Sequence, residues 1–297
     1  NVYFSTKKFR EYGKLSKQPI EDLESGARID VNDEKQDPLD FALWKAQKPG
    51  EPAWESPWGM GRPGWHIECS VMSKKYLGER IDIHAGGEDL LFPHHENEIA
   101  QSEAANGKEF SKYWMHNAFL NIDNRKMSKS LGNFRTVREI SEQYDLQVLR
   151  FFMLSAHYRS PLNFSADLME ASKNGLDRIV TAVANLKHLL SVASVEAMTA
   201  EETAMFEKTS TYVTAFEAAM EDDFNTADAI SSVFELVKYA NTTATSECSK
   251  EYLQGLKDLI VKLADVLGLI VEKEEELLAE DIEALIEERQ AARKAKN

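Results

Sequence analysis

The segment Lys126-Met127-Ser128-Lys129-Ser130 gathers residue types that suit phosphate chemistry. Two ammonium groups and two hydroxyls lie within five residues, and Gly132 follows shortly after. Charged and hydrogen-bonding groups placed where negative charge develops stabilise a leaving group such as pyrophosphate. A lysine-rich turn is common on protein surfaces, so this interpretation depends on what accompanies the segment.

Three possible ligands for a soft metal ion lie upstream: Cys69, His94 and Glu98. His94 and Glu98 are four residues apart, which places both on one face of a helix. A thiolate, an imidazole and a carboxylate together suit zinc. His95 is the alternative to His94, but its helical phase differs from that of Glu98. The spacing alone leaves open that Cys69 is simply buried and that the histidines cap or solvate a helix.

The elements predicted around these residues form an α/β sheet. The apolar pattern and Gly78 predict a helix over residues 65–77, and a strand follows over residues 80–84. The strand ends at Gly86-Gly87, where a ligand can approach the backbone closely. Nucleotides usually bind at the carboxyl ends of strands in such sheets.

A second helix is predicted over residues 93–105 and a second strand over residues 113–122. An Asp123-Asn124 turn then indicates a hairpin, and the connections permit parallel pairing of the two strands. Earlier in the chain, residues 39–46 are expected to form a short amphipathic helix.

After residue 135 the pattern is helical. Thr136 and Glu139 predict a capping box, and residues 146–155 form a dense apolar helix. Long amphipathic segments follow at 166–192, 200–221, 224–245, 250–270 and 275–295. The predicted fold class is therefore α/β followed by all-α: a partial Rossmann-like nucleotide-binding sheet, then an antiparallel helical bundle.

Composition narrows the class of protein. The 297 residues carry a net charge of −15, which argues against a general nucleic-acid coat but allows a local basic strip. No apolar run reaches the roughly 20 residues that span a bilayer, and the first four residues do not resemble a secretory leader. Cys69 and Cys248 are the only cysteines, which fits a reducing cytoplasm. We therefore expect a cytoplasmic protein without a membrane partner.

Taken whole, the lysine-rich segment resembles the second signature of the class I aminoacyl-tRNA synthetases. Within that class, three segments resemble the cysteinyl-tRNA synthetases. They are Gly64-Trp65-His66-Ile67-Glu68-Cys69, Phe92-Pro93-His94-His95-Glu96-Asn97-Glu98 and residues 155–164. The resemblance runs along almost the whole chain and is strongest from residue 61 to residue 164.

The resemblance implies a role for each matching residue. It makes Lys126 and Lys129 the catalytic residues that stabilise pyrophosphate. It makes Trp65 and His84 neighbours of the bound cysteine. The implied zinc ligands are Cys69, His94 and Glu98. The implied ATP site, with Mg²⁺ accompanying the nucleotide, comprises Gly86, Gly87, Asp89, His116, Lys126, Met127, Ser128, Lys129 and Ser130. Met127 is expected mainly to pack the loop in place.

The resemblance also implies a parent enzyme that joins cysteine to tRNA(Cys) through cysteinyl-adenylate and acts as a monomer. In that family the first ATP signature, the first half of the nucleotide fold and a fourth, cysteine zinc ligand precede this region. A domain that reads the anticodon follows it. We therefore expect an internal fragment with little activity of its own. The expected divisions are a connective remnant at 1–60, the catalytic half at 61–135, linker helices at 136–165 and the tRNA-binding bundle at 166–297.

Three alternatives stay open. A related ligase joins cysteine to an amino sugar and shares the zinc and the pyrophosphate loop. A non-catalytic module that binds metal or RNA would keep the fold without the chemistry. A purely structural helical scaffold would not hold zinc.

Overall fold

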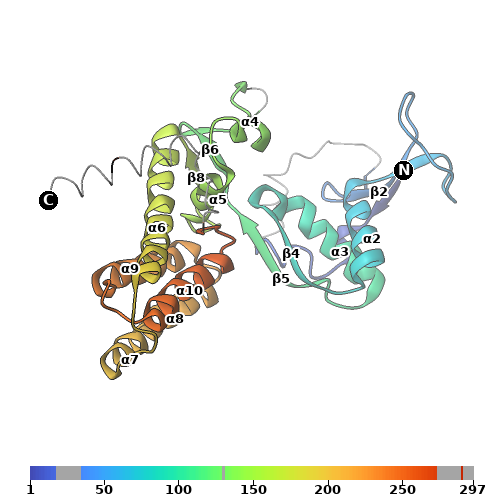
Figure 1. The fold of residues 1–297 in the computed structure, drawn as a ribbon. Coiled ribbons are helices and arrows are strands. Elements are labelled where there is room, and N and C mark those ends of the chain that lie inside the picture. Colours follow the sequence, from blue (N-terminus) through green and yellow to red (C-terminus); the bar gives the residue numbers. More distant parts are fainter. Residues whose placement is uncertain (18–34, 129–130, 273–288, 290–297) are drawn as a thin grey trace. The chain divides into compact units, whose positions relative to one another are not determined.

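The computed structural model describes residues 1–17, 35–128, 131–272 and 289 (Figure 1). The chain forms two compact units. The first contains residues 1–127 and 158–163, and the second contains residues 128–157 and 164–297. The first unit holds sheets and helices, whereas the second is mostly helical.

The first unit begins with a small antiparallel sheet. Its strands are arranged in the order β1 (Val2–Phe4), β2 (Phe41–Ala46) and β3 (Gly61–Pro63), and a 3₁₀ turn follows β1 at Thr6–Lys8. The sequence-based prediction of a helix over residues 39–46 is wrong. Phe41 and Trp44 are residues that favour strands. β2 pairs with β1 and β3, which lie far from it in the sequence, so a local pattern does not reveal the pairing.

A helix–strand–helix–strand arrangement follows. It consists of α2 (Trp65–Leu77), β4 (Ile81–Gly87), α3 (Glu96–Asn106) and β5 (Ser111–Asn117). β4 and β5 pair in parallel, with Ile81 opposite Ser111 and Gly87 opposite Asn117. The predicted helix over residues 65–77 and the parallel pairing are both confirmed. The helix α3 forms part of the crossover connection between the two strands, as a parallel pair requires.

The chain between β4 and α3 differs from the prediction. Gly86 and Gly87 belong to the strand itself. A 3₁₀ turn at Glu88–Leu90 is followed by a π-helical turn at Leu91–His95, inside which Phe92 has an extended backbone. The regular α-helix therefore begins at Glu96, three residues later than the proline at its predicted start suggests.

The predicted strand over residues 113–122 is two strands. After β5 the chain passes Ala118, whose N–H donates to the Tyr158 carbonyl at 2.8 Å. The hairpin strands β6 (Leu120–Ile122) and β7 (Arg125–Lys126) follow, and the third strand of that sheet is β8 (Leu162–Phe164), in the order β7-β6-β8. The predicted turn is confirmed: Asp123 and Asn124 have φ of 48° and 61°, as a two-residue hairpin loop of type I′ requires.

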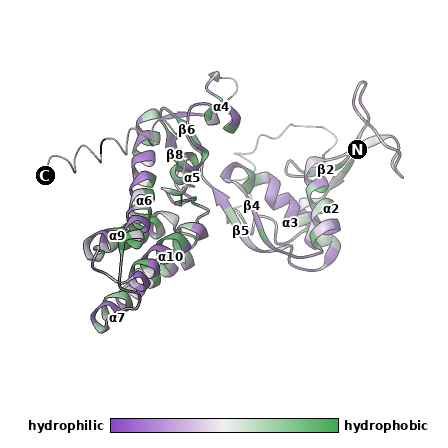
Figure 2. Ribbon diagram, viewed as in Figure 1, coloured by the Kyte–Doolittle hydropathy of each residue, from purple (hydrophilic) through white to green (hydrophobic). Residues whose placement is uncertain are grey.

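The second unit contains seven described helices. They are α4 (Val137–Ser141), α5 (Leu146–Leu154), α6 (Ala166–Val192), α7 (Ala200–Glu207), α8 (Ser210–Glu221), α9 (Thr226–Thr243) and α10 (Lys250–Val266). Apolar and polar residues alternate around the long helices (Figure 2). Their buried faces form the core with Ile179, Val183, Leu236, Leu256 and Ile260, all almost completely inaccessible.

The helix ends follow local signals in most places. Thr136 and Glu139 form the predicted capping box. The predicted helix over residues 200–221 is broken between α7 and α8, where the buried Thr209 donates both its N–H and its hydroxyl to the Phe206 carbonyl. The start of α9 is delayed to Thr226 because Asp223 and Phe224 both have φ of 55°. The predicted helix over 275–295 lies outside the described residues, Arg289 excepted. No described helix is both long and apolar enough to cross a membrane.

Candidate metal and nucleotide site

Five of the seven histidines gather in the first unit, where α2, the start of α3 and the ends of β4 and β5 meet. They are His66, His84, His94, His95 and His116. Trp114 packs among them, with its ring centroid 4.7 Å from that of His84 and 5.2 Å from that of His95. The surroundings are therefore aromatic and rich in nitrogen donors.

Two sets of side chains bring possible metal ligands together. Within each set the candidate ligand atoms lie within 4.8 Å of one another. One set is Cys69, His94 and Glu98, as the sequence suggested. The other is His84, His95 and Glu98. Both use the Glu98 carboxylate, and only the first offers sulfur.

Glu98 is the centre of this arrangement, and its side chain is fully buried. Oε1 lies 3.3 Å from His94 Nε2, and Oε2 lies 2.7 Å from His84 Nε2. Neither approach has hydrogen-bond geometry, so among the described residues both oxygens lack a hydrogen-bond partner. A buried carboxylate in this condition needs a compensating charge.

Further contacts orient the histidines. Nδ1 of His94 lies 2.7 Å from Nδ1 of His66, which leaves His94 Nε2 facing Glu98. Nδ1 of His95 lies 2.8 Å from Nε2 of His116. Metal-binding histidines usually have their second ring nitrogen held in this way. Both candidate sets therefore contain a histidine whose orientation is fixed by another histidine.

The site holds its groups in defined charge states. Burial alone would raise the pKa of the Glu98 carboxyl, but the His84 and His94 imidazoles outweigh it and lower the pKa to about 2. Burial lowers the pKa of His66 and of His95 to about 4, so both rings are neutral at neutral pH. Burial, together with the charge of Glu98, raises the pKa of the Cys69 thiol to about 11. The site thus contains an ionised carboxylate, the two neutral imidazoles of His66 and His95, and a protonated thiol.

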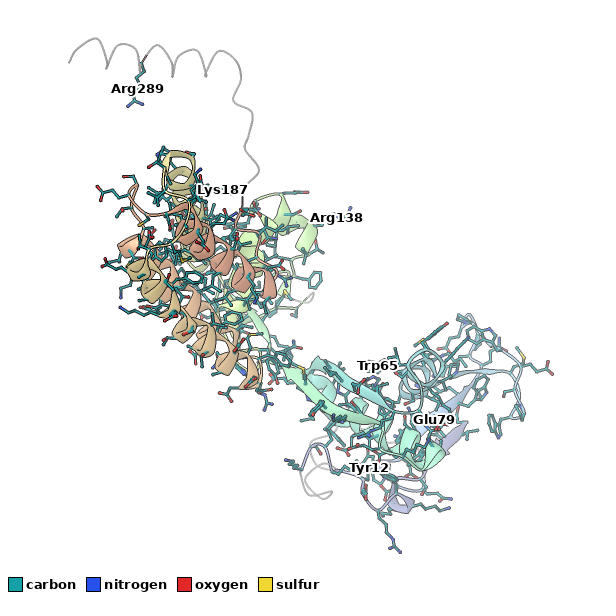
Figure 3. The ribbon with its side chains drawn as sticks, turned by 60° about the horizontal axis from the view of Figure 1, so that its bottom comes forward. Tyr12, Trp65, Glu79, Arg138, Lys187 and Arg289 are labelled. Carbon is teal, nitrogen blue, oxygen red and sulfur yellow. The ribbon has the colours of Figure 1, made fainter. Side chains whose placement is uncertain are left out.

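Trp65, which is labelled in Figure 3, packs against one residue of the cluster. Its indole stacks on the His94 imidazole, with ring centroids 4.1 Å apart and planes inclined by 24°. The Trp65 side chain is 56% exposed, so one face of its indole contacts His94 and the other side faces solvent. An aromatic group in this position can form one wall of a small-molecule pocket.

The glycines of β4 have a structural reason to be glycine. A Cβ at Gly86 would lie 2.8 Å from Cε1 of His95, and a Cβ at Gly87 would lie 2.6 Å from Oδ1 of Asp89. His116 is the β5 partner of Gly86 in the sheet. The structure thus brings Gly86, Gly87, Asp89 and His116 together at the carboxyl end of the parallel pair, where nucleotides commonly bind.

The lysine-rich loop is described only in part, since Lys129 and Ser130 lie outside the described residues. Lys126 ends β7, and its ammonium group lies 5.2 Å from the centre of the Phe119 ring. The N–H of Ser128 donates to Asn133 Oδ1 at 2.9 Å, and its hydroxyl accepts from the Leu131 N–H. The roles expected of this loop stay predictions.

Two residues of the site, His66 and Gln101, were not predicted from the sequence. His66 contacts His94, and Gln101 contacts the His66 carbonyl and the Ser70 hydroxyl. The signal for His66 was its place three residues before Cys69 on one helix. Gln101 is likewise three residues after Glu98.

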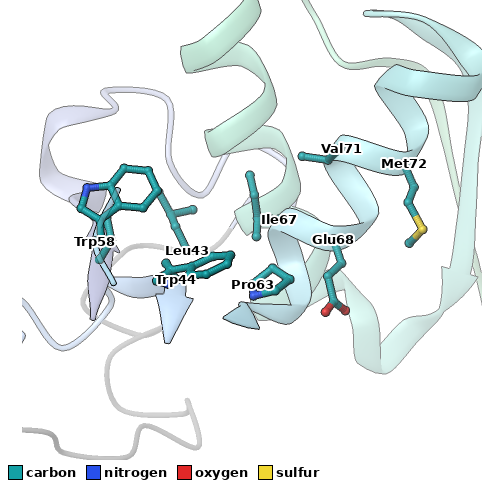
Figure 4. Close-up of a pocket in the computed structure, with 9 residues that line it drawn as sticks. Leu43, Trp44, Trp58, Pro63, Ile67, Glu68, Val71 and Met72 are labelled. Atoms are coloured by element: carbon teal, nitrogen blue, oxygen red, sulfur yellow. The ribbon is translucent and has the colours of Figure 1, made fainter. Parts of the chain in front are cut away.

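A separate apolar groove of about 740 Å³ lies between α2 and the first sheet (Figure 4). Trp44 and Trp58 line one side, and Ile67 and Val71 of α2 line the other. Cys69 does not line it. The groove is therefore distinct from the candidate metal site.

Comparisons with known proteins agree with the sequence motifs. A family model described as the tRNA synthetases class I (C) catalytic domain matches residues 1–174, and the DALR domain model matches residues 215–272. The chain is 66% identical to a cysteine–tRNA ligase of Lachnospira eligens and 61% identical to one of Lachnoclostridium phytofermentans. Each match covers all of this chain and 64% of the relative.

Among solved structures, the chain is similar to the ternary complex of Agrobacterium radiobacter K84 agnB2 LeuRS-tRNA-LeuAMS. The TM-score is 0.56 at 16% identity, and the match covers 71% of this chain and 31% of that one. This similarity concerns the fold, and it confirms the predicted order of an α/β region before helices. Because the catalytic-domain model covers residues 1–174, more than half of the chain, the protein belongs to the class I (C) tRNA synthetases.

Proposed function

We propose that this chain carries the amino-acid-selecting and nucleotide-facing part of a ligase that joins cysteine to tRNA(Cys). The names of the two relatives support this reaction. The chain spans 64% of their length, so the activity is proposed for the whole protein of which these residues form part. In that reaction ATP first activates cysteine as cysteinyl-adenylate, and the tRNA then receives the amino acid.

Cys69, His94 and Glu98 are the proposed ligands of a zinc ion. Their donor atoms already lie close together, and the buried Glu98 carboxylate, which has no hydrogen-bond partner in the part of the chain that the structure describes, would be compensated by a cation. A Cys/His/carboxylate set suits Zn²⁺. When bound, zinc supplies a soft position that prefers a thiolate to a hydroxyl, which distinguishes cysteine from serine. A pocket of ordinary contacts rejects a close isostere poorly.

The other proposed roles follow the family resemblance, together with the positions of the described side chains. Trp65, stacked on His94 and half exposed, forms a wall for the amino acid, and His84 offers a polar group beside it. The strand end that carries Gly86, Gly87, Asp89 and His116 faces the adenosine of ATP. The loop binds the phosphates and their Mg²⁺. It comprises Lys126, Met127, Ser128, Lys129 and Ser130. Two lysine charges there stabilise the departing pyrophosphate. The helical unit is proposed to bind the tRNA.

The observation that carries this proposal is the meeting of the Cys69, His94 and Glu98 donor atoms. The test is elemental analysis of the chain purified without added metal and after dialysis against zinc. We expect close to one zinc per chain, retained in Cys248→Ser and lost in Cys69→Ser. Cys248 belongs to the helical unit, so it provides a matched control. Equal zinc content in the two variants would contradict the assignment.

A further inference from the structure

Apolar burial does little to fix the position of α2. Ser70 is the only residue of the helix that is fully buried. Val71, Met72, Tyr76 and Leu77 are each more than half exposed. Cys69 must nevertheless be held opposite α3 if its sulfur is to share an ion with His94 and Glu98. Some other interaction has to set the register of the two helices.

Polar side chains supply that interaction. Gln101 of α3 is buried, and its Nε2 donates to Ser70 Oγ at 2.6 Å and to the His66 carbonyl. Ser102 donates its hydroxyl to the same Ser70 oxygen at 2.9 Å. The carbonyl of His66 can only accept, so the amide nitrogen of Gln101 must face it. The orientation of the Gln101 amide is thereby determined, although its Oε1 has no hydrogen-bond partner among the described residues.

These contacts lie directly beside Cys69 and His94, two of the three proposed zinc ligands. Ser70 follows Cys69 in the chain. His66, whose carbonyl Gln101 holds, lies with its own ring 2.7 Å from His94. A slip of α2 by one residue would move the Cys69 sulfur by about 1.5 Å along the helix and rotate it by about 100°. Metal–ligand distances tolerate only about 0.2 Å.

We propose that Gln101 is a positioning residue for the zinc site. Through Ser70 and His66 it fixes how α2 lies on α3, and so it determines where the Cys69 sulfur and the His94 ring stand. This inference rests on the zinc site of the proposed function. It adds a residue that neither touches the ion nor contacts the amino acid.

The test uses cobalt in place of zinc, because a cobalt ion bound by a cysteine sulfur has a sulfur-to-metal absorption band in the near ultraviolet. The variant Gln101→Met keeps the side-chain length and removes both donors. We expect cobalt to bind about 10-fold to 100-fold more weakly, as for other residues that support metal ligands, and the band to lose intensity at saturation. Ser70→Ala should act in the same direction and serves if Gln101→Met does not fold.

The matched control is Ile99→Val on the same helix. Ile99 is buried against Ile81 and Phe110 and does not belong to the contacts with Ser70 or His66. This change weakens packing, but it should alter cobalt affinity less than about threefold. All variants are measured at a temperature at which circular dichroism shows them folded.

The outcomes separate the two claims. Unchanged affinity and band in Gln101→Met, or an equal loss in Ile99→Val, would overturn the positioning role and leave the zinc site intact. A wild-type chain that shows no sulfur band, or a band that persists in Cys69→Ser, would overturn the zinc assignment itself and the positioning role with it.

Discussion

Zinc binding should release close to one proton per ion from this protein, and that proton should come from Cys69. Burial and the Glu98 charge raise the pKa of the thiol to about 11, so the thiol is protonated in the metal-free protein at neutral pH. The metal binds the thiolate. The Glu98 carboxyl, whose pKa is lowered to about 2, is already ionised and contributes no proton.

The magnitude follows from this stoichiometry. Release of one proton strengthens zinc binding about tenfold for each pH unit, or about 1.4 kcal/mol, as long as the pH stays below the thiol pKa. The useful window is about pH 7.5 to 9, above the ordinary titration range of imidazole. Calorimetry in buffers of different ionisation enthalpy counts the protons, and titration against a competing chelator gives the dissociation constant at each pH.

Two variants and one rival site make the result decisive. Cys248→Ser should keep the proton release and the slope, whereas Cys69→Ser should lose the proton and bind zinc more than about 100-fold more weakly. The set His84, His95 and Glu98 has no thiol to deprotonate, so an ion held there would release no side-chain proton in this window, and its affinity would not depend on Cys69. A flat pH dependence with unchanged affinity in Cys69→Ser would refute our assignment in favour of that set.

Three further changes test the fold around the site and in the helical unit. Gly86→Ala should displace the His95 ring and lower the free energy of unfolding by about 1–3 kcal/mol, measurable in urea. Glu96→Gln should lower it by about 2–4 kcal/mol and speed amide exchange at Gly13, Leu15 and Ser16, whose N–H groups donate to the carboxylate. Burial alone would raise the pKa of Glu202, but backbone hydrogen bonds, including one from the Ser249 N–H, lower it. The stabilisation from Glu202 should therefore be complete above about pH 5. It should decline as the pH falls through and below the pKa of about 4.3 that the carboxyl has in the unfolded chain. Glu202→Gln should remove this decline from acid unfolding curves.

The elements that the sequence predicted well carry their own signals. The helix α2 ends at Gly78, whose φ of 99° is typical of glycine. The turn at Asp123-Asn124 and the capping box at Thr136 are fixed within a few residues. The long helix α6 matches its predicted bounds of 166–192 because its apolar period persists for the whole length. Local chemistry was sufficient in each case.

The misjudged elements depend on distant partners. β2 is a strand because β1 and β3 lie on either side of it. The π-helical turn at Leu91–His95 departs from the regular helix that the spacing of His94 and Glu98 suggested. Both side chains still converge, at 3.3 Å, so the pairing was predicted although the backbone was not.

The site shows the same division. Spacing indicated His94 with Glu98, the soft-ligand character of a thiolate added Cys69, and the family resemblance favoured the whole set. Neither indicated that His84 and His95 form a second set around the same carboxylate, because those contacts join a strand to the start of a helix. Gln101 also escaped, since its partners lie 31 and 35 residues away in the chain.

Because polar contacts hold α2 against α3, zinc binding and the stability of α2 should depend on each other. An apolar interface tolerates small shifts, whereas hydrogen bonds such as those of Gln101 weaken steeply with misalignment. A ligand that binds only the folded arrangement stabilises it in proportion to the logarithm of its concentration. In our proposal, zinc held by Cys69 of α2, by His94 just before α3 and by Glu98 of α3 would join the same two helices that Gln101 joins. Removing zinc should therefore raise amide exchange in α2 more than in β4 or β5, and Gln101→Met should enlarge that difference.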